Sequence, residues 1–504
     1  MASEQLFLLI KSLQPEEKRQ FHLFTSKYLR NKGNNYLKLF ETIDRMDRYD
    51  EDLIREKYKN AVFLKQLHVT KNYLYNLILQ SLTLPHLGSA SEGPLGEILI
   101  HAEILYKKSL YASCLKLVEK GKDLARKKEK PLMLLEFYTL EQRIAIKRHS
   151  PEMFRELSVK GYYEMLQAQE EIRNFIELRR LLNSLIVIME KPFEMLSDET
   201  RVKLYEESNH PLLRTEASAL MTDAKIMYFN YWRQFYDYTH DYKKALEIAQ
   251  KYVEFFRTES LAGKTDIFQG ALFSHTNLFQ AQLKCRKFDM AEDTLQMISE
   301  IPSHTADQKL NKAERVNLLR LNLLMEKGAF DQALEYASET EDFLKRYEEK
   351  ISRKYRFEIL SSLSTLHFYC GNYHKSLQHR NALLNHNEKE IPDEILELSM
   401  LHEAVLHYHL GNLDLIPYKI KALRRFFKKR KDYTALETEL IKLISALSSR
   451  RKKEASPLFS NALPTFKKLK KQKINLPYFD NFDFISWLEA SGKGITVSEL
   501  TKNK

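Results

Sequence analysis

The chain has 504 residues and a formal net charge of +12, and 43% of its residues are hydrophobic while 29% are charged. The apolar and charged residues are mixed throughout, which excludes bulk disorder, and 13 glycines and 13 prolines supply few turns for a sheet-rich fold. Most apolar positions hold Leu, Ile, Phe or Tyr at the i, i+3, i+4 spacing of an amphipathic helix. The sequence therefore predicts an all-α protein.

The cysteines and the apolar runs bear on the location of the protein. Cys114, Cys285 and Cys370 lie far apart in sequence, which is typical of a reducing compartment rather than of a disulfide framework. No stretch approaches the ~20 consecutive apolar residues of a membrane span, and the first residues lack the long apolar segment of a signal peptide. We expect a cytoplasmic protein with no membrane partner.

Residues 1–87 do not share the repeat that follows and are predicted to form a separate helical N-terminal module. Within them, the stretch Phe63–Ile78 resembles a helix-turn-helix in which Thr70 caps the second helix. His68 departs from the motif, because glycine usually holds that turn position. The second helix is expected to present outward four side chains that can contact phosphates and base edges: Lys71, Asn72, Tyr75 and Asn76. The sequence favours the other interpretation, in which this helix simply covers the first repeat and its polar side chains are solvated.

The clearest local pattern lies at Gly328–Leu334. Gly328 can adopt the left-handed conformation that closes a helix, and Phe330 then begins the next one. Ala333 is small enough for the two antiparallel helices to approach closely. The same turn–aromatic–x–x–small pattern begins at three further aromatic residues: Tyr242, Phe288 and Tyr373. Looser matches or turn-like points fall at Tyr111, Pro151, Pro192 and Leu413.

The spacing of this pattern indicates a repeat. The aromatic positions 242, 288, 330 and 373 are separated by 46, 42 and 43 residues. The unit resembles the middle of a tetratricopeptide (TPR) repeat, although it is longer than the ~34 residues of a standard TPR. The resemblance implies a right-handed α-solenoid of TPR-like helix pairs over residues 95–475, with room for three similar units between Tyr111 and Tyr242. An irregular bundle of amphipathic helices is the alternative.

Positive charge is concentrated near the C-terminal end of the predicted solenoid. Between Lys419 and Lys473, 18 basic residues stand against 4 acidic ones, which leaves +14 of the net charge in this segment. Five of the basic residues follow the i, i+3, i+4, i+7, i+8 spacing of one helix face: Lys421, Arg424, Arg425, Lys428 and Lys429. We call these five residues the basic stripe. It is interpreted either as a polyanion-binding surface, for an acidic protein or nucleic acid, or as a solvated solenoid end.

The last segment, residues 476–504, is predicted to be a capping helix and a tail. Its aromatic-rich part, Tyr478–Leu488, places Phe482, Ile485 and Leu488 where they can close the end of a solenoid.

No feature of the sequence indicates an enzyme. It contains no phosphate-binding glycine loop, and His402 and His407 are five residues apart rather than the four that place two zinc ligands on one helix face. No catalytic residue, metal ligand or cofactor is therefore predicted.

The leading functional hypothesis is a scaffold that binds a protein or peptide partner. In a solenoid each repeat contacts only its neighbours, which leaves a long concave surface, lined here by the segments Arg315–Met325 and Arg356–Tyr369. The alternative is a nucleic-acid-binding regulator, since the layout is similar to that of peptide-responsive bacterial regulators with a helix-turn-helix head and a TPR sensor domain. Residues 1–87 hold 14 basic and 10 acidic residues, only a mild positive excess for such a head.

Overall fold

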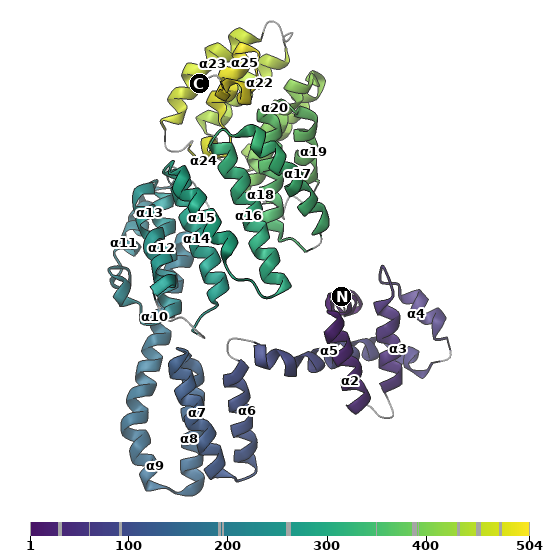
Figure 1. The fold of residues 1–504 in the computed structure, drawn as a ribbon, viewed down its shortest axis with the longest axis vertical. Helices are drawn as coiled ribbons and strands as arrows, with labels where there is room; N and C mark the ends of the chain where they lie inside the picture. Colours follow the sequence, from purple (N-terminus) through teal and green to yellow (C-terminus); the bar gives the residue numbers. More distant parts are fainter. Residues whose placement is uncertain are drawn as a thin grey trace. The chain divides into compact units, whose positions relative to one another are not determined.

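The computed structural model describes residues 2–28, 33–59, 61–89, 93–189, 193, 196–258, 264–348, 350–385, 391, 393–430, 434–449, 455–472 and 476–502. These residues are helical throughout, with short turns and no strand, so the predicted all-α class is confirmed for them (Figure 1). The chain divides into two compact units, Met1–Ile172 and Arg173–Lys504. This division falls inside the segment that the sequence assigned to one solenoid.

The first unit contains α1 (Ala2–Ser12), α2 (Pro15–Tyr28), α3 (Gly33–Asp44), α4 (Glu51–Lys57), the 3-10 helix η1 (Val62–Gln66), α5 (Leu67–Ser89), α6 (Gly93–Lys107), α7 (Tyr111–Lys127), α8 (Pro131–Arg148), α9 (Pro151–Glu156), the π-helical turn η2 (Leu157–Gly161) and the start of α10 (Tyr162–Ile188). Its N-terminal helices share one core, which includes Leu6, Phe21, Phe40 and Leu74. A second core joins α6, α7 and α8 around Cys114 and Phe137.

The second unit continues with α11 (Asp198–Ser208), the 3-10 helices η4 (Pro211–Leu213) and η5 (Glu216–Ser218), α12 (Thr222–Tyr238), α13 (Tyr242–Thr258), α14 (Ile267–Lys284), α15 (Phe288–Glu300), α16 (Ala306–Glu326), α17 (Phe330–Arg346), α18 (Arg353–Tyr369), α19 (Tyr373–Leu384), α20 (Asp393–Leu410), η7 (Leu413–Leu415), α21 (Ile416–Arg430), α22 (Ala435–Ser448), α23 (Ser456–Lys470), α24 (Leu476–Asn481), α25 (Phe484–Lys493) and α26 (Val497–Lys502). From α12 to α23, each helix packs against the next along the chain. The first helices of successive pairs also touch: α14 contacts α16, α16 contacts α18, α18 contacts α20 and α20 contacts α22.

The turns between paired helices lie where the sequence placed them. Gly328, Gly371 and Gly411 have φ values of +73°, +79° and +78°, and His240 and Arg286 adopt the same left-handed conformation. In each turn the next backbone N–H bonds back to the preceding helix, as Ala329 N does to Leu324 O at 2.9 Å. The small residues of the pattern are buried, as predicted: Ala245, Ala291, Ala333 and Ser376.

The prediction of three similar repeats between Tyr111 and Tyr242 is wrong. There α9 has 6 residues, α10 has 27, and two 3-10 helices precede α12. The reason is visible in the sequence: no glycine or proline interrupts the chain between Gly161 and Pro192, so a single long helix forms. The turn-like point at Pro192 lies outside the described residues.

The C-terminal segment α24–α26 packs back on earlier helices of the second unit. Two helices replace the single capping helix of the prediction, with Phe482 and Leu488 buried. The Tyr478 hydroxyl lies between the carboxylates of Glu397 on α20 and Glu437 on α22. Further along, a Cβ added to Gly328 would lie 2.8 Å from Thr501 Cγ2, so α26 packs closely on the α16–α17 turn.

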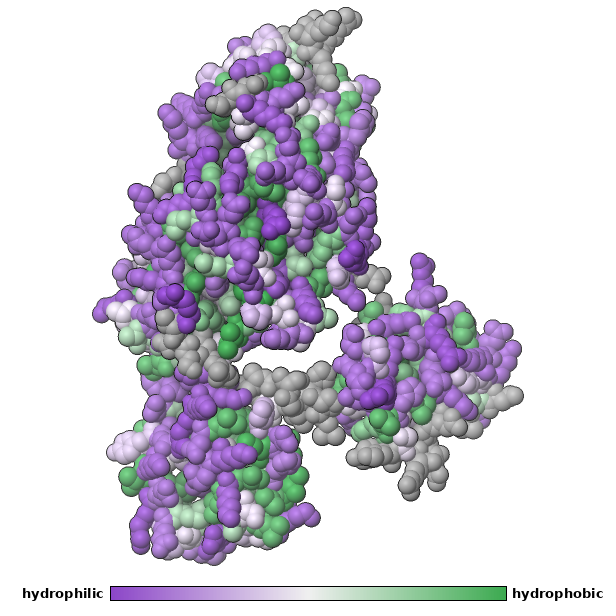
Figure 2. Space-filling view, in the orientation of Figure 1, coloured by the Kyte–Doolittle hydropathy of each residue, from purple (hydrophilic) through white to green (hydrophobic). Residues whose placement is uncertain are grey.

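The surface is largely hydrophilic on the face that Figure 2 shows, with apolar residues scattered among the polar ones. Among the described helices, none combines the length and the apolar character needed to cross a membrane.

Candidate functional site

The possible helix-turn-helix, which the sequence favoured less than a covering helix, is not present at Phe63–Ile78. The 3-10 helix η1 leads directly into α5, which begins at Leu67 and continues through Thr70 without a turn. Thr70 therefore caps no helix, and its hydroxyl instead donates to Gln66 O at 3.1 Å. Position 68 holds His rather than the glycine that would open a turn. The apolar residues therefore keep their helical spacing across this position, and one helix forms.

Lys71 does not face outward. It is only 3% exposed, its Nζ lies 2.6 Å from Glu51 Oε2, and it donates to the Tyr49 hydroxyl at 3.2 Å. Hydrogen bonds from Lys71 and Arg55 lower the pKa of Glu51 to about 2. Asn72 and Asn76 are exposed and Tyr75 is half-buried, so α5 presents no cation at this position.

The basic stripe lies on α21, and its side chains face solvent as far as the structure describes them. Lys421, Arg424, Arg425 and Lys428 are exposed, whereas the side chain of Lys429 lies outside the described residues. Leu423 and Phe427 are fully buried on the opposite side of the same helix. The further basic run Arg450–Lys453 also lies outside the described residues.

A row of polar side chains links the first helices of the pairs. Arg315 on α16 donates to the Thr276 hydroxyl on α14 at 3.5 Å and lies 5.1 Å from the ring centroid of Tyr355 on α18. Ser362 on α18 donates to Asn322 on α16 at 2.8 Å. The Nε of Arg315 is buried and has no hydrogen-bond partner among the described residues. This row therefore keeps unused hydrogen-bonding capacity.

A histidine–carboxylate cluster joins α17, α18 and α19. The Nε2 atoms of His367 and His379 lie 3.2 and 3.1 Å from Glu341 Oε1, and the two imidazole rings stack with planes 12° apart. Lys375 Nζ lies 2.8 Å from the same oxygen. Helical spacing explains the convergence, because Lys375 and His379 are four residues apart on α19 and so share one face.

The cluster is arranged around a carboxylate. Burial alone would raise the pKa of Glu341, but hydrogen bonds from His367, His379 and Lys375 hold it well below its ordinary value. Burial lowers the pKa of His367, which favours its neutral form. One carboxylate oxygen and two imidazole nitrogens within 4.8 Å of one another form the donor set that Zn²⁺ and similar cations prefer. The Lys375 ammonium binds the carboxylate oxygen of this donor set.

This cluster was not predicted from the sequence, because its three residues come from separate helices. A compositional signal was available: seven of the 16 histidines lie between positions 360 and 410. His402 and His407, whose spacing did not predict a zinc site, are both buried and contact different groups. His402 Nδ1 lies 2.5 Å from Arg380, and His407 Nε2 lies 3.9 Å from Glu403.

Known proteins supply no further constraint on these sites. The basic stripe, the polar row and the histidine–carboxylate cluster are defined by geometry alone. Comparison with family models, with curated proteins and with solved structures finds no match.

Proposed function

We propose that the second unit is a right-handed TPR-like α-solenoid that acts as a non-enzymatic scaffold and binds a protein partner on its row of first helices. The observation that carries the proposal is the continuous contact of these helices, from α14 through α16 and α18 to α20. A solenoid built in this way offers one extended surface rather than a closed cleft, which suits an extended peptide or a helix of a partner.

The polar row supplies the chemistry of recognition. Arg315 lies on the face where α14, α16 and α18 meet, and its side chain is half-buried, so the guanidinium can donate to a carbonyl or carboxylate of a partner. Charge-assisted hydrogen bonds from a partly buried arginine are among the strongest contacts in protein interfaces. Acidic or main-chain oxygen atoms are therefore the groups that this surface is suited to bind.

The test is quantitative affinity capture with a matched pair of variants. Arg315→Met keeps the aliphatic stem against Tyr355 and removes the donors, whereas Lys345→Met removes a cation that is 77% exposed on the second helix α17. We expect a partner recovered with the parent to be retained by Lys345→Met and lost by Arg315→Met. Equal recovery by both variants would place any partner elsewhere.

Polyanion binding at the basic stripe is a second candidate function. It is favoured by the exposure of Lys421, Arg425 and Lys428 on one side of α21 while Leu423 and Phe427 anchor the other side in the core. Cations on one helix face repel one another, and a nucleic acid would relieve that repulsion and release its own counterions. The N-terminal helix-turn-helix plays no part in this candidate.

Retention on DNA or RNA at increasing salt tests the stripe. Reversing Lys421, Arg425 and Lys428 to Glu should abolish retention and leave the fold intact, since exposed charges contribute little to stability. A control reversal of three exposed lysines on α7, Lys116, Lys120 and Lys127, should leave it unchanged. If the stripe variant binds as well as the parent, the stripe is not the site. If the parent itself fails to bind at low salt, the nucleic-acid candidate is wrong.

A further inference from the structure

Arg380 on α19 is a cation buried in the core of the second unit. It is 2% exposed, its Nη1 donates to the Ser399 hydroxyl at 2.8 Å and its Nη2 to His402 Nδ1 at 2.5 Å. Its Nε is buried and has no hydrogen-bond partner among the described residues. Burial lowers the pKa of Arg380 to about 9, and the carboxylate of Glu403 opposes that shift only in part.

Its neighbours do not neutralise this charge. Both direct partners are neutral acceptors, and no carboxylate in the described part of the chain forms an ion pair with Arg380. Glu403 is already bound by Lys419, whose Nζ lies 2.6 Å from it. One positive charge therefore remains in a region from which water is largely excluded, an arrangement that is costly without a counterion.

The hydrogen bond from Arg380 also fixes the proton of His402. Arginine can only donate, so His402 Nδ1 is the acceptor and the neutral ring carries its proton on Nε2. That Nε2–H is buried and finds no acceptor among the described residues. Burial, together with the charges of Arg380 and His409, lowers the pKa of His402 well below its ordinary value, so the ring stays neutral.

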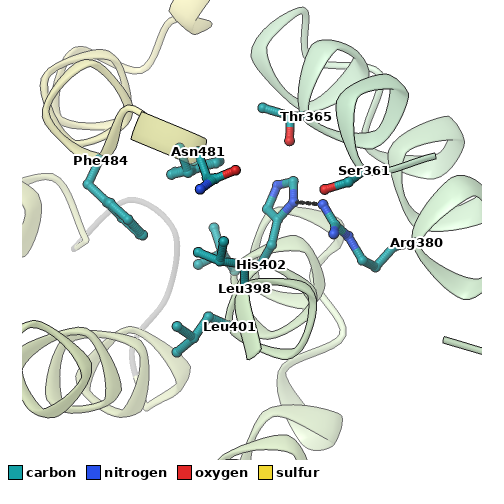
Figure 3. A pocket seen from close by; sticks show the side chains of 10 residues that line it. Ser361, Thr365, Arg380, Leu398, Leu401, His402, Asn481 and Phe484 are labelled. Carbon is teal, nitrogen blue, oxygen red and sulfur yellow. Dashed lines mark hydrogen bonds between the residues drawn. The ribbon is translucent and has the colours of Figure 1, made fainter. Parts of the chain in front are cut away.

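A cavity of about 20 Å³ lies beside these groups. Figure 3 shows the His402 ring directed into the space between Thr365 of α18 and Asn481 of α24, with Arg380 hydrogen-bonded to it on one side and Phe484 on the other side. Since a water molecule needs roughly 10–15 Å³ by the same measure, the cavity has room for one atom-sized guest and not for a phosphate or a sulfate.

We propose that this cavity is a binding site for a single monatomic anion, chloride under ordinary conditions, held by the His402 Nε2–H and by the charge of Arg380. A neutral water could satisfy the donor, but it could not compensate the buried guanidinium. The hydroxyl groups of Ser361 and Thr365 line the same space and can turn their protons toward an anion.

The site also has a structural consequence for the C-terminal segment. Asn481, Phe482 and Phe484 form one wall of the cavity, while the opposite wall comes from α18, α19 and α20. An anion between these walls lowers the free energy of the state in which α24 and α25 are docked. Chloride should therefore slow hydrogen exchange in Phe484–Lys493 as well as raise the unfolding temperature.

The experiment is thermal unfolding of the full chain in sodium chloride, sodium bromide or sodium gluconate at constant ionic strength. Chloride and bromide should raise the unfolding temperature of the parent, and at 100 times the dissociation constant the unfolding equilibrium constant should fall about 100-fold. Arg380→Met, which removes the charge and keeps the length of the side chain, should show no halide dependence. Arg425→Met, an exposed site on α21, should behave as the parent.

Two results would overturn the proposal. One is a parent whose unfolding temperature is the same in chloride and gluconate, which would mean that the cavity holds only water. The other is an Arg380→Met variant that keeps the halide dependence, which would place the anion elsewhere. Should that variant not fold, bromide-soaked crystals of the parent decide the question: an anomalous peak beside His402 Nε2 supports the site, and its absence excludes it.

Discussion

The two units of the molecule differ in how the charge of a buried cation is compensated. In the first unit, Lys71 lies 2.6 Å from Glu51, and Lys122 lies 2.8 Å from Glu141 and 2.6 Å from Glu119. In the second, Arg380 donates only to a hydroxyl and an imidazole. The first arrangement is complete within the chain, whereas the second leaves a charge that a ligand can satisfy.

The difference shows why burial alone does not distinguish a structural charge from a binding site. A buried ion pair is strongly destabilised when one partner is removed, because the other charge is left in the core. A buried charge without a partner in the chain has no such stabilisation to lose, so its replacement by an apolar side chain of similar size costs little unless a bound ligand compensates the charge. Substitution of each cation therefore separates the two cases.

The largest expected effect is that of Lys122→Met in the first unit. It leaves the Glu141 carboxylate buried without its cation, so we expect a loss of ~3–5 kcal/mol of stability. Native-state hydrogen exchange of α7 and α8 measures this loss locally. Lys120→Met, an exposed position on the same helix, is the control and should change little. Equal protection in the two variants would mean that the pair does not stabilise the unit.

As the pH falls, the second unit should lose stability before the first unit does. The pKa values of His367 and His402 are lowered in the folded state, so the unfolded state binds protons that the folded state excludes. Their stabilisation is full above about pH 6.5 and is lost as the pH falls below it, by up to ~1.4 kcal/mol per pH unit for each histidine. For Glu51, with its pKa lowered to about 2, the loss begins only below about pH 4.5 and ends near pH 2.

Thermal unfolding from about pH 7.5 to about pH 5 tests this order. The transition of the second unit should shift to lower temperature across this range, and the shift should be smaller in His402→Asn, whose amide oxygen can still accept from Arg380. His304→Asn, at an exposed position, should match the parent. If the first unit unfolds earlier on acidification, the assignment of the pH response to the buried histidines is wrong.

The sequence predicted the local features of the fold better than its contacts between distant residues. The turns at Gly328, Gly371 and Gly411 follow from residue type, because glycine adopts a left-handed φ without strain. The same conformation at His240 and Arg286 was recovered only through the aromatic residue that follows each turn. The regular repeat between Tyr111 and Tyr242 failed, since spacing alone did not reveal the single long helix α10.

The sites show the same limit. Exposure of the basic stripe followed from helical periodicity, which a sequence displays directly. The burial of Lys71 did not, because it depends on Glu51, which is 20 residues away and on another helix. The cluster of Glu341, His367 and His379 and the pair of Arg380 and His402 likewise arise from the packing of consecutive helices. Whether the protein is cytoplasmic stays a prediction.

The smallest expected effect on stability is that of Lys375→Met in the histidine–carboxylate cluster. Lys375 forms an ion pair with Glu341, as Lys71 does with Glu51. The side chain of Lys375 is 41% exposed, however, so its removal should lower the free energy of unfolding by no more than ~1 kcal/mol. Its removal should nevertheless change cation binding, because the ammonium lies 2.8 Å from the Glu341 oxygen that a divalent ion would bind and repels such an ion. We expect the affinity for Co²⁺ or Zn²⁺ to rise about tenfold or more, ~1.4 kcal/mol, in Lys375→Met. Titration followed by the visible spectrum of Co²⁺ measures this change, and Lys345→Met, an exposed position on α17, is the control.

An unchanged titration would mean that the stacked imidazole rings cannot rotate to place both Nε2 atoms on one ion. In that case Glu341 would be compensated within the chain, as Glu51 is, and of the buried charges compared here only Arg380 would call for a ligand.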